Sequence, residues 1–456
     1  MSEYTEFLES KMHCGVDHGF EPLWMQDDLF DFQRDLVEWA LRKGRGALFE
    51  DCGLGKTIQQ LVWSENVVRK TNGRTLILTP LAVTSQTARE ATKFGMEAAV
   101  SRDGKLDGFP KTVITNYERL HYFDPSDFAA IVADESGILK NFDGATKAAV
   151  TEFARKLPYR LLCTATPSPN DYIELGTSSE ALGEMGFMDV LNRFFKKAEK
   201  TMSRRQELRT GIYRFRGHAE RDFWRWVCSW ARSVRKPSDL GYSNEGFDLP
   251  PLMTAEHVIK ARNLREGYLF DLPAFGLQEQ REERRRTITE RCEKAAELVT
   301  NTGEPAVCWC HLNDEGDMIE RLIPDAVQIA GKDSDDRKEE IFQAFQDGEI
   351  RVLVSKSSIA GFGVNWQHCA HQTFFPSHSF ESWYQSIRRS WRFGQTKPVK
   401  IDVITTEGEK NILNNLQRKQ EQAGRMFDNL VEMMNDELKI QTKPYGGIRE
   451  EIPTWL

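Results

Sequence analysis

The stretch Ala47–Thr57, ALFEDCGLGKT, constrains this chain more than any other. Its apolar start predicts a buried strand, and the pattern that begins at Lys56-Thr57 predicts a helix. Between them, Gly53 and Gly55 allow a tight turn whose backbone N–H groups and helix N-terminus face an anion. Lys56 can then reach the β- and γ-phosphates of a nucleotide, and the Thr57 hydroxyl can ligate Mg²⁺. The stretch therefore predicts a phosphate-binding loop between a strand and a helix.

This loop departs from the general pattern at one position. A phosphate-binding loop usually has glycine six residues before the lysine, and here that residue is Glu50. Strings of the form GxGKT also occur in loops that bind no nucleotide. A plain strand-to-helix turn is thus the alternative interpretation, and the rest of the chain has to decide between the two.

The composition indicates a soluble globular protein. The chain has 456 residues, enough for two or three domains, and 40% of them are hydrophobic. The net charge of −8 provides no bulk attraction to nucleic acid, so such contacts must come from local basic patches. The eight cysteines form no CxxC pair, and His13, Cys14 and His18 lack a fourth zinc ligand. This cysteine pattern predicts a reduced, cytoplasmic compartment. The acidic N-terminus is unlike a signal peptide, and the apolar runs are too short for a membrane helix, so no membrane partner is expected.

Downstream of the loop, apolar strands alternate with helical stretches. The rhythm predicts a parallel sheet covered by helices, with strands at Thr75–Leu78, Thr112–Thr115, Ala129–Ala133 and Arg160–Thr164. Ligands of such sheets bind at the carboxyl ends of the strands. The residues that follow the strands are therefore candidates for a site, and they are Thr79-Pro80, Asn116-Tyr117, Asp134-Glu135 and Ala165-Thr166-Pro167.

Among these residues, Asp134-Glu135 has the side chains best suited to catalysis. One carboxylate can hold Mg²⁺ through water, and the other can orient or deprotonate the water that attacks a γ-phosphate. The alternative is an ordinary surface pair of acids. The apolar strand directly before Asp134, downstream of a GKT loop, favours the site.

Gln33 lies one short helix upstream of the loop. A glutamine amide has a donor and an acceptor, so it can bind an adenine edge with two hydrogen bonds. By itself such a residue is uninformative, because most glutamines are simply solvated. Its place before the loop makes it a candidate for adenine binding.

From about Gly176 to Leu249 the alternation stops, and arginine interleaves with aromatic residues. Phe223, Trp226 and Trp230 recur at helical spacing, which predicts a core face. The basic clusters, including Arg214 and Arg216, have the composition that phosphate contact with base or sugar stacking requires, so we expect a DNA-facing surface. The stretch 237–251 is expected to link this segment to a second lobe.

The second half repeats the alternation without a GKT of its own, which suggests a paired lobe that closes over the first. A charged helix over Glu279–Val299 precedes it, and an N-capped amphipathic helix is expected over Asp333–Phe345. From about Glu407 the tail predicts a helix that packs on the second lobe. The expected strands are Ala306–Cys310, Val327–Ile329, Arg351–Val354, Thr373–Phe375 and Val399–Ile404.

Strings from both halves resemble the motifs of superfamily-2 helicases, in the family's order. ADESGILKN (Ala133–Asn141) is similar to motif II of Swi/Snf-type DNA translocases, with Gly137 in place of the family's histidine. YQSIRRSWRFGQ, followed by TKPV, resembles motif VI, with Trp391 in place of a histidine. The other matching strings are GLGKT, TPLAVTSQ, TNYERL, CTATPSPND and GFGVN, which resemble motifs I, Ia, Ib, III and V. The compact phage and bacterial members look most similar.

The resemblance implies a role for each matching residue. It implies that Lys56, Asp134, Glu135, Arg389 and Arg392 carry catalysis, and that Thr57 and Asp134 hold Mg²⁺. It also implies that Arg389 and Arg392, one helical turn apart, project into the facing lobe. The expected ATP-binding residues are Gln33, Gly53, Leu54, Gly55, Lys56, Thr57, Gly363 and Gln385, and the coupling residues are Thr164, Ala165 and Thr166. The expected DNA contacts are Thr79, Pro80, Asn116, Lys140, Asn141, Ser357, Arg214 and Arg216.

The resemblance also implies an α/β fold of two RecA-like lobes with parallel sheets and a helical basic and aromatic insertion. The expected segments are 1–28, lobe one at 29–175, the insertion at 176–250, lobe two at 251–433 and a tail at 434–456. Such a motor would use ATP and Mg²⁺ to move on duplex, forked or branched DNA as a monomer, in a bacterial cytoplasm or nucleoid. Three alternatives remain: an RNA helicase of the same superfamily, an unrelated P-loop enzyme, and an ATP-binding DNA clamp with weak turnover.

Overall fold

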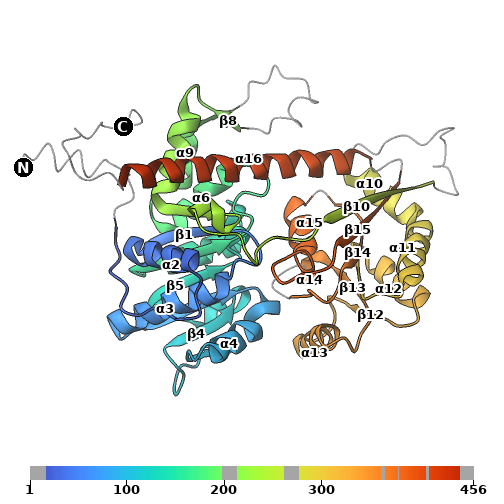
Figure 1. Ribbon diagram of the computed structural model, residues 1–456, viewed down its shortest axis with the longest axis horizontal. Helices are drawn as coiled ribbons and strands as arrows, with labels where there is room; N and C mark the ends of the chain where they lie inside the picture. The colour runs from blue at the N-terminus through green and yellow to red at the C-terminus, as the bar shows by residue number, and fades with distance from the viewer. Residues whose placement is uncertain are drawn as a thin grey trace, which may run out of the picture. The chain divides into compact units, whose positions relative to one another are not determined.

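The computed structural model describes residues 17–197, 213–260, 277–360, 365–377, 379–406 and 410–441. They divide into two compact units (Figure 1). Unit 1 comprises the chain up to Asn244 together with the residues from Ala423 onward, and unit 2 comprises Glu245–Gln422. No helix among these described residues has both the length and the apolar character to cross a bilayer.

Unit 1 is built on a seven-stranded sheet in which every strand pair is parallel. The four strands expected downstream of the loop are confirmed, because runs of apolar residues there are buried on both faces. In spatial order the strands are β3 (Ala98–Val100), β4 (Thr112–Asn116), β2 (Arg74–Thr79), β5 (Phe128–Asp134), β6 (Tyr159–Thr164), β1 (Arg45–Glu50) and β9 (Ala231–Val234).

Helices cover this sheet and share its apolar core. The α-helices are α2 (Asp31–Lys43), α3 (Lys56–Thr71), α4 (Thr84–Lys93), α5 (Ala145–Arg155), α6 (Leu175–Leu182), α7 (Phe187–Phe194) and α9 (Ala219–Trp230). Short 3₁₀ turns are η1 (Leu81–Val83), η2 (Tyr117–Tyr122), η3 (Pro125–Asp127), η4 (Ser136–Lys140), η5 (Tyr172–Glu174) and η6 (Pro237–Leu240). The expected core face of α9 is confirmed, since Phe223, Trp226 and Trp230 are fully buried.

Strand β9 corrects the expectation that the alternation stops at Gly176. It adds to the edge of the sheet beside β1, with Ala47 opposite Ala231. The strand is only four residues long and contains Arg232, so its composition did not suggest a buried strand. Arg232 is buried because its guanidinium stacks on Trp39, 4.6 Å from the ring centroid, and donates to Cys228 O at 2.6 Å. It is a structural arginine rather than part of a DNA-facing surface.

A small antiparallel ribbon also belongs to unit 1. It pairs β7 (Phe195–Lys197) with β8 (Tyr213–Phe215). Its inner face, Phe195 and Phe215, packs on α9, so the segment after Gly176 is a mixed insertion rather than a purely helical one.

Unit 2 has a six-stranded sheet, again entirely parallel. The two parallel α/β units confirm the expected fold class. The edge strand β10 was not expected, because none of its residues is buried and it lacks the continuous apolar run of a central strand. In spatial order the strands are β10 (Leu252–Ile259), β15 (Val399–Thr406), β14 (His371–Phe374), β11 (Ala306–Cys310), β13 (Val352–Lys356) and β12 (Ala326–Ile329).

Unit 2 begins with two successive charged helices, α10 and α11, where a single helix was expected. Thr287 separates α10 from α11, and its Oγ1 donates to Glu283 O at 2.8 Å. In the expected amphipathic helix, Ile341, Phe342 and Phe345 are buried as predicted. The helices are α10 (Leu277–Arg286), α11 (Ile288–Thr302), α12 (Asn313–Leu322), α13 (Asp335–Gln346), α14 (Ser357–Ala360) and α15 (Phe380–Ile387).

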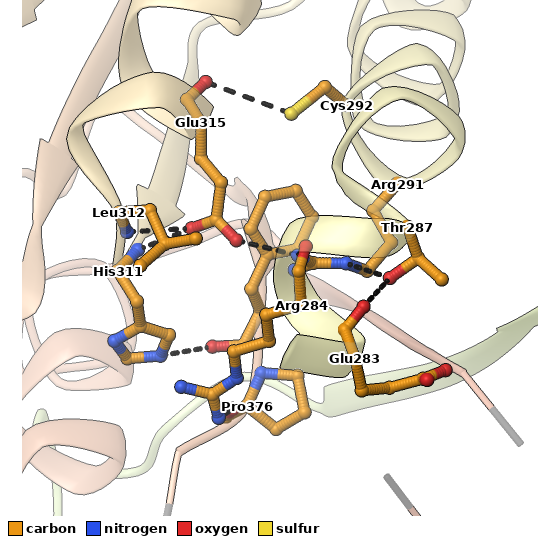
Figure 2. A network of polar contacts seen from close by, with 10 residues as sticks. Glu283, Arg284, Thr287, Arg291, Cys292, His311, Leu312, Glu315 and Pro376 are labelled. Carbon is orange, nitrogen blue, oxygen red and sulfur yellow. Dashed lines mark hydrogen bonds and ion pairs between the residues drawn. The ribbon is translucent and has the colours of Figure 1, made fainter. Parts of the chain in front are cut away.

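A buried ion pair holds the helical layer of unit 2 together (Figure 2). Arg291 of α11 donates to Glu315 Oε1 at 2.7 Å, and neither side chain is exposed. Glu315 Oε2 accepts from the backbone N–H groups of His311 and Leu312, at 2.7 and 2.9 Å. These bonds join α11 to the start of α12.

The tail helix α16 (Lys410–Gln441) corrects another expectation, that the tail packs on the second lobe. From Ala423 onward its residues belong to unit 1. The reason is an apolar stripe at helical spacing, which joins the core of unit 1 and consists of Met426, Phe427, Leu430 and Met434. Ser168 Oγ lies 2.9 Å from Met426 Sδ, and Cys228 Sγ lies 3.6 Å from Leu430 O.

Candidate nucleotide-binding site

The predicted phosphate-binding loop lies between β1 and α3. Gly53 and Gly55 have φ angles of 91° and 84°, in the left-handed region that side chains disfavour. A Cβ atom on Gly55 would lie only 2.3 Å from Gln33 Nε2. Glycine is therefore required at this position by both backbone conformation and space.

The Gln33 side chain holds the loop from the side of α2. It is buried, its Oε1 accepts from Phe30 N at 3.0 Å, and its Nε2 donates to Leu54 O at 2.7 Å. The structure thus brings Gln33, Leu54 and Gly55 together. Its amide is engaged with the protein, and its proposed contact with adenine stays a prediction.

Lys56 folds back over the loop at the start of α3. Its Nζ donates to Glu50 O at 2.9 Å and to Asp51 O at 3.1 Å. Burial alone would lower the pKa of Lys56, but Cys52 and the carboxyl groups of Glu135, Glu50 and Asp134 raise it overall. The charged form is therefore favoured, as a lysine that binds phosphate requires.

Glu50, the residue that departs from the general loop pattern, is completely buried. Its Oε2 accepts from Gln59 Nε2 at 2.8 Å. Burial raises the pKa of Glu50 to about 7, against the opposing effects of Lys56 and Gln59. Sequence reasoning missed this contact. Its signal was the pair Gln59-Gln60 among the apolar residues Ile58, Leu61 and Val62 at the start of the helix.

Asp134 is the last residue of β5 and points toward α3. Its Oδ1 accepts from Gln60 Nε2 at 2.7 Å, and its backbone O accepts from the Tyr117 hydroxyl at 2.6 Å. Burial and the neighbouring Glu135 raise the pKa of Asp134 to about 6. A raised pKa on a buried acid beside a charged lysine is typical of a functional site.

Glu135 follows with a φ angle of 51°, which is unusual for a residue with a side chain. Such strain persists where surrounding contacts enforce it, and it gathers at functional sites. Thr164 Oγ1 lies 3.5 Å from Glu135 Oε2, and Thr166 N donates to Thr164 Oγ1 at 3.1 Å. Two of the predicted coupling residues therefore connect to the predicted base, while Ala165 is buried between them.

The oxygen donors at the loop fit Mg²⁺. Thr57 stands in the first turn of α3, and Asp134 ends β5. Among the described residues, no group of three or more histidine, cysteine or acidic side chains could hold a metal. Mg²⁺ is commonly held by one or two protein oxygens, with phosphate and water as the other ligands. Thr57 and Asp134 are the residues that would hold it here.

In unit 2, the predicted arginines lie beyond a helix end rather than on a helix. Helix α15 stops at Ile387, and the N–H of Arg389 bonds back three residues to Ser386 O at 3.2 Å. Arg389 is buried, and its Nε and Nη2 donate to the O and Oε1 atoms of Gln385, at 2.9 and 2.7 Å. Arg392 is half-buried in the turn that follows. The predicted Gly363 lies outside the described residues.

The predicted DNA contacts fall into two groups. Several side chains are closed to solvent because they cap the turns that follow the strands. Thr79 Oγ1 bonds to Thr84 Oγ1 at 2.9 Å, and Asn116 Oδ1 accepts from Arg119 N at 3.1 Å. The buried members are Thr79, Asn116 and Ser357, the half-buried ones are Pro80 and Lys140, and the exposed ones are Asn141, Arg214 and Arg216. Only the last three present open side chains.

Comparison with known proteins agrees with this site. Residues 32–215 match the model of the SNF2-related domain. This stretch is similar to SNF2-related domains. It begins at the residue before Gln33 and ends with β8, so it contains the loop, Asp134-Glu135 and the Thr164 contacts. The expected kinship with Swi/Snf-type proteins is confirmed.

No curated protein matches the chain. Among solved structures, the chain is similar to the SWI2/SNF2 ATPase core of Sulfolobus solfataricus in complex with dsDNA. The sequence identity is 17% and the TM-score is 0.42, over 92% of this chain and 98% of that one.

Proposed function

We propose that this protein is a DNA-dependent ATPase that moves along duplex or branched DNA. The observation that carries the proposal is the cluster of Lys56, Asp134 and Glu135 at the carboxyl ends of β1 and β5, inside a SNF2-related domain. A lysine with its charge retained and two adjacent acids are what phosphoryl transfer to water requires.

In this proposal each residue of unit 1 has one task. Lys56 leaves the carbonyls of Glu50 and Asp51 to bind the β- and γ-phosphates of ATP. Asp134, oriented by Gln60, would hold Mg²⁺ together with Thr57, and the bound ion would neutralise charge on the phosphate oxygens. Glu135 orients the attacking water and accepts its proton.

The proposed coupling begins at Glu135. Glu135 contacts Thr164, and the Thr164 hydroxyl accepts a hydrogen bond from the backbone N–H of Thr166. A change in the charge of the Glu135 carboxylate would therefore alter the position of Thr166. In unit 2, Gln385 holds the Arg389 guanidinium in one orientation. Such an arginine would stabilise charge that develops on the transferred phosphoryl group.

The test is ATP hydrolysis in the presence of duplex, single-stranded or forked DNA, or of RNA. Duplex or forked DNA should stimulate turnover, and RNA should not. Lys56→Ala and Glu135→Gln should each abolish hydrolysis, with ATP binding retained in Glu135→Gln. Arg389→Ala should lower kcat by a factor of about 10³ or more and leave ATP affinity nearly unchanged. The exposed Lys105→Ala serves as the control.

Three results would count against the proposal. Unchanged turnover in Glu135→Gln would remove the assigned base. A loss of ATP affinity alone in Arg389→Ala would show that this arginine only binds the nucleotide. Stimulation by RNA and not by DNA would favour an RNA helicase.

A further inference from the structure

The ribbon of β7 and β8 separates its side chains into two faces. The strands pair with Phe195 opposite Phe215, Lys196 opposite Arg214 and Lys197 opposite Tyr213. Because side chains alternate along a strand, Lys196 and Arg214 share the face opposite to that of the two phenylalanines. Both cationic side chains are exposed.

An aromatic cluster fixes the inner face. Phe195 and Phe215 stack with ring centroids 4.8 Å apart, and both contact Phe223 of α9. Phe215 also stacks on Tyr172, which follows the predicted coupling residues in the chain, at 5.8 Å. The base of the ribbon is therefore a packed part of unit 1.

The outer face brings like charges together. Residues directly opposite in an antiparallel pair have Cβ atoms about 5 Å apart, and like charges there are unfavourable. In the described part of the chain, no acidic side chain pairs with Lys196, Lys197 or Arg214. Arg216 extends the ladder by one bond, from its N–H to Phe194 O at 2.9 Å, and is exposed.

A concentrated positive face is unexpected in a chain with a net charge of −8. Without an anion, its repulsion opposes the folding of the ribbon. A polyanion with regularly spaced charges would offset that repulsion by neutralising several of these side chains at once. Among the described residues of the ribbon, no apolar side chain lies on this face, which argues against an apolar protein partner.

We propose that the outer face of the β7–β8 ribbon, formed by Lys196 and Arg214, binds the phosphate backbone of duplex DNA. This inference rests on the proposed function and assigns one of its DNA contacts. Arg216 is a lesser contributor, because its Nε donates to Phe195 O at 2.7 Å and so supports the ribbon itself.

The test is the salt dependence of duplex binding by the full chain, measured by fluorescence anisotropy of a labelled DNA. In Lys196→Gln/Arg214→Gln, the slope of log affinity against log salt should become shallower by about 1.8, because two phosphate contacts are lost. The charge-preserving variant Lys196→Arg/Arg214→Lys should keep the wild-type slope. Lys105→Gln/Lys156→Gln, which removes two exposed lysines of unit 1, controls for net charge and should also keep it.

The melting temperature separates a binding effect from misfolding. Neutralising the like-charged pair should leave the melting temperature of the glutamine variant equal to or above that of the wild type. An unchanged slope in this variant, or an equal change in the Lys105/Lys156 control, would overturn the inference while the proposed function stands. A slope change seen only with duplex RNA would also overturn it. If the wild type bound no duplex DNA, the inference and the proposed function would both fail.

Discussion

At the scale of single residues, several residues in and around the phosphate-binding loop adopt energetically unfavourable arrangements. Glu50 is buried with one carboxylate oxygen, Oε1, that has no hydrogen-bond partner within the described residues. Glu135 occupies a left-handed conformation, and Gly55 leaves no room for a Cβ atom. A buried acceptor without a donor is unfavourable unless the group is protonated or reached by water. Protonation of the Glu50 carboxyl group reduces this cost, in agreement with its raised pKa.

Glu50→Gln should therefore change stability in a pH-dependent way. The folded-state pKa of Glu50 is about 7, above its ordinary value of 4.5. The stabilisation from its bound proton is thus complete below pH 4.5 and is lost as pH rises through 7. The unfolding free energy of Glu50→Gln relative to wild type should rise by up to about 3 kcal/mol between pH 4.5 and 8.

Urea titrations at several pH values would measure this difference. The exposed Glu97→Gln is the control and should show no such trend. A difference between Glu50→Gln and wild type that stays constant with pH would show that Glu50 remains ionised in the folded protein.

At the scale of elements, the helical layer of unit 2 depends on the Arg291–Glu315 pair (Figure 2). Burial alone would raise the pKa of Glu315, but Arg291 and the N–H groups of Leu312 and His311 lower it overall. Burial and the neighbouring Arg284 lower the pKa of His311 to about 4, and its Nε2 donates to Phe375 O at 2.6 Å. One charged pair and a neutral histidine thus connect α11, α12 and the residues after β14.

Removing one partner of this pair should destabilise the protein strongly. Arg291→Met leaves a buried carboxylate without its cation and should lower the unfolding free energy by about 3–5 kcal/mol. Arg291→Met/Glu315→Leu, which removes both charges, should recover much of that loss. The exposed pair Arg337–Glu340 is the control, and Glu340→Gln should change stability by less than about 1 kcal/mol. Equal losses in the single and double variants would contradict this account.

At the scale of the whole molecule, the chain leaves unit 1 at Asn244 and returns to it at Ala423. The returning part of α16 supplies apolar side chains to the core of unit 1, and Arg235 forms an ion pair with Asp428. The core of unit 1 therefore remains incomplete until residues that follow unit 2 in the sequence have been added. Long-range closure of this kind links the stability of unit 1 to the end of the chain.

Leu430→Ala tests this link. Leu430 is buried in the core of unit 1, so its truncation should lower the unfolding free energy of that unit by about 2–5 kcal/mol. Hydrogen exchange should accelerate in β1 and β6 and remain unchanged in β11 and β13. The exposed Leu322→Ala should have little effect. Faster exchange confined to unit 2 would mean that α16 serves that unit instead.

Much of the fold was predictable because its signals are local. Buried parallel strands are continuous apolar runs, so nine of the thirteen strands in the two parallel sheets were expected downstream of the loop, in addition to β1. Three strands were not expected: β3, β9 and β10. Each is short or lies at a sheet edge. The residues of such a strand need not form an apolar run, because their burial depends on packing partners that are distant in sequence.

The sequence by itself determined the order of strands and helices, the loop glycines and the acids at the end of β5, because periodicity, turn conformation and strand ends are properties of neighbouring residues. Only the tertiary structure decided which polar side chains are exposed to solvent and which are buried. It buried Thr79 and Asn116 as caps, engaged Gln33 with Leu54 and enclosed Arg232. It also assigned Met426 and Leu430 to unit 1. The reason is that burial depends on contacts between residues up to 258 positions apart, as between Ser168 and Met426, and no local pattern encodes such a partner.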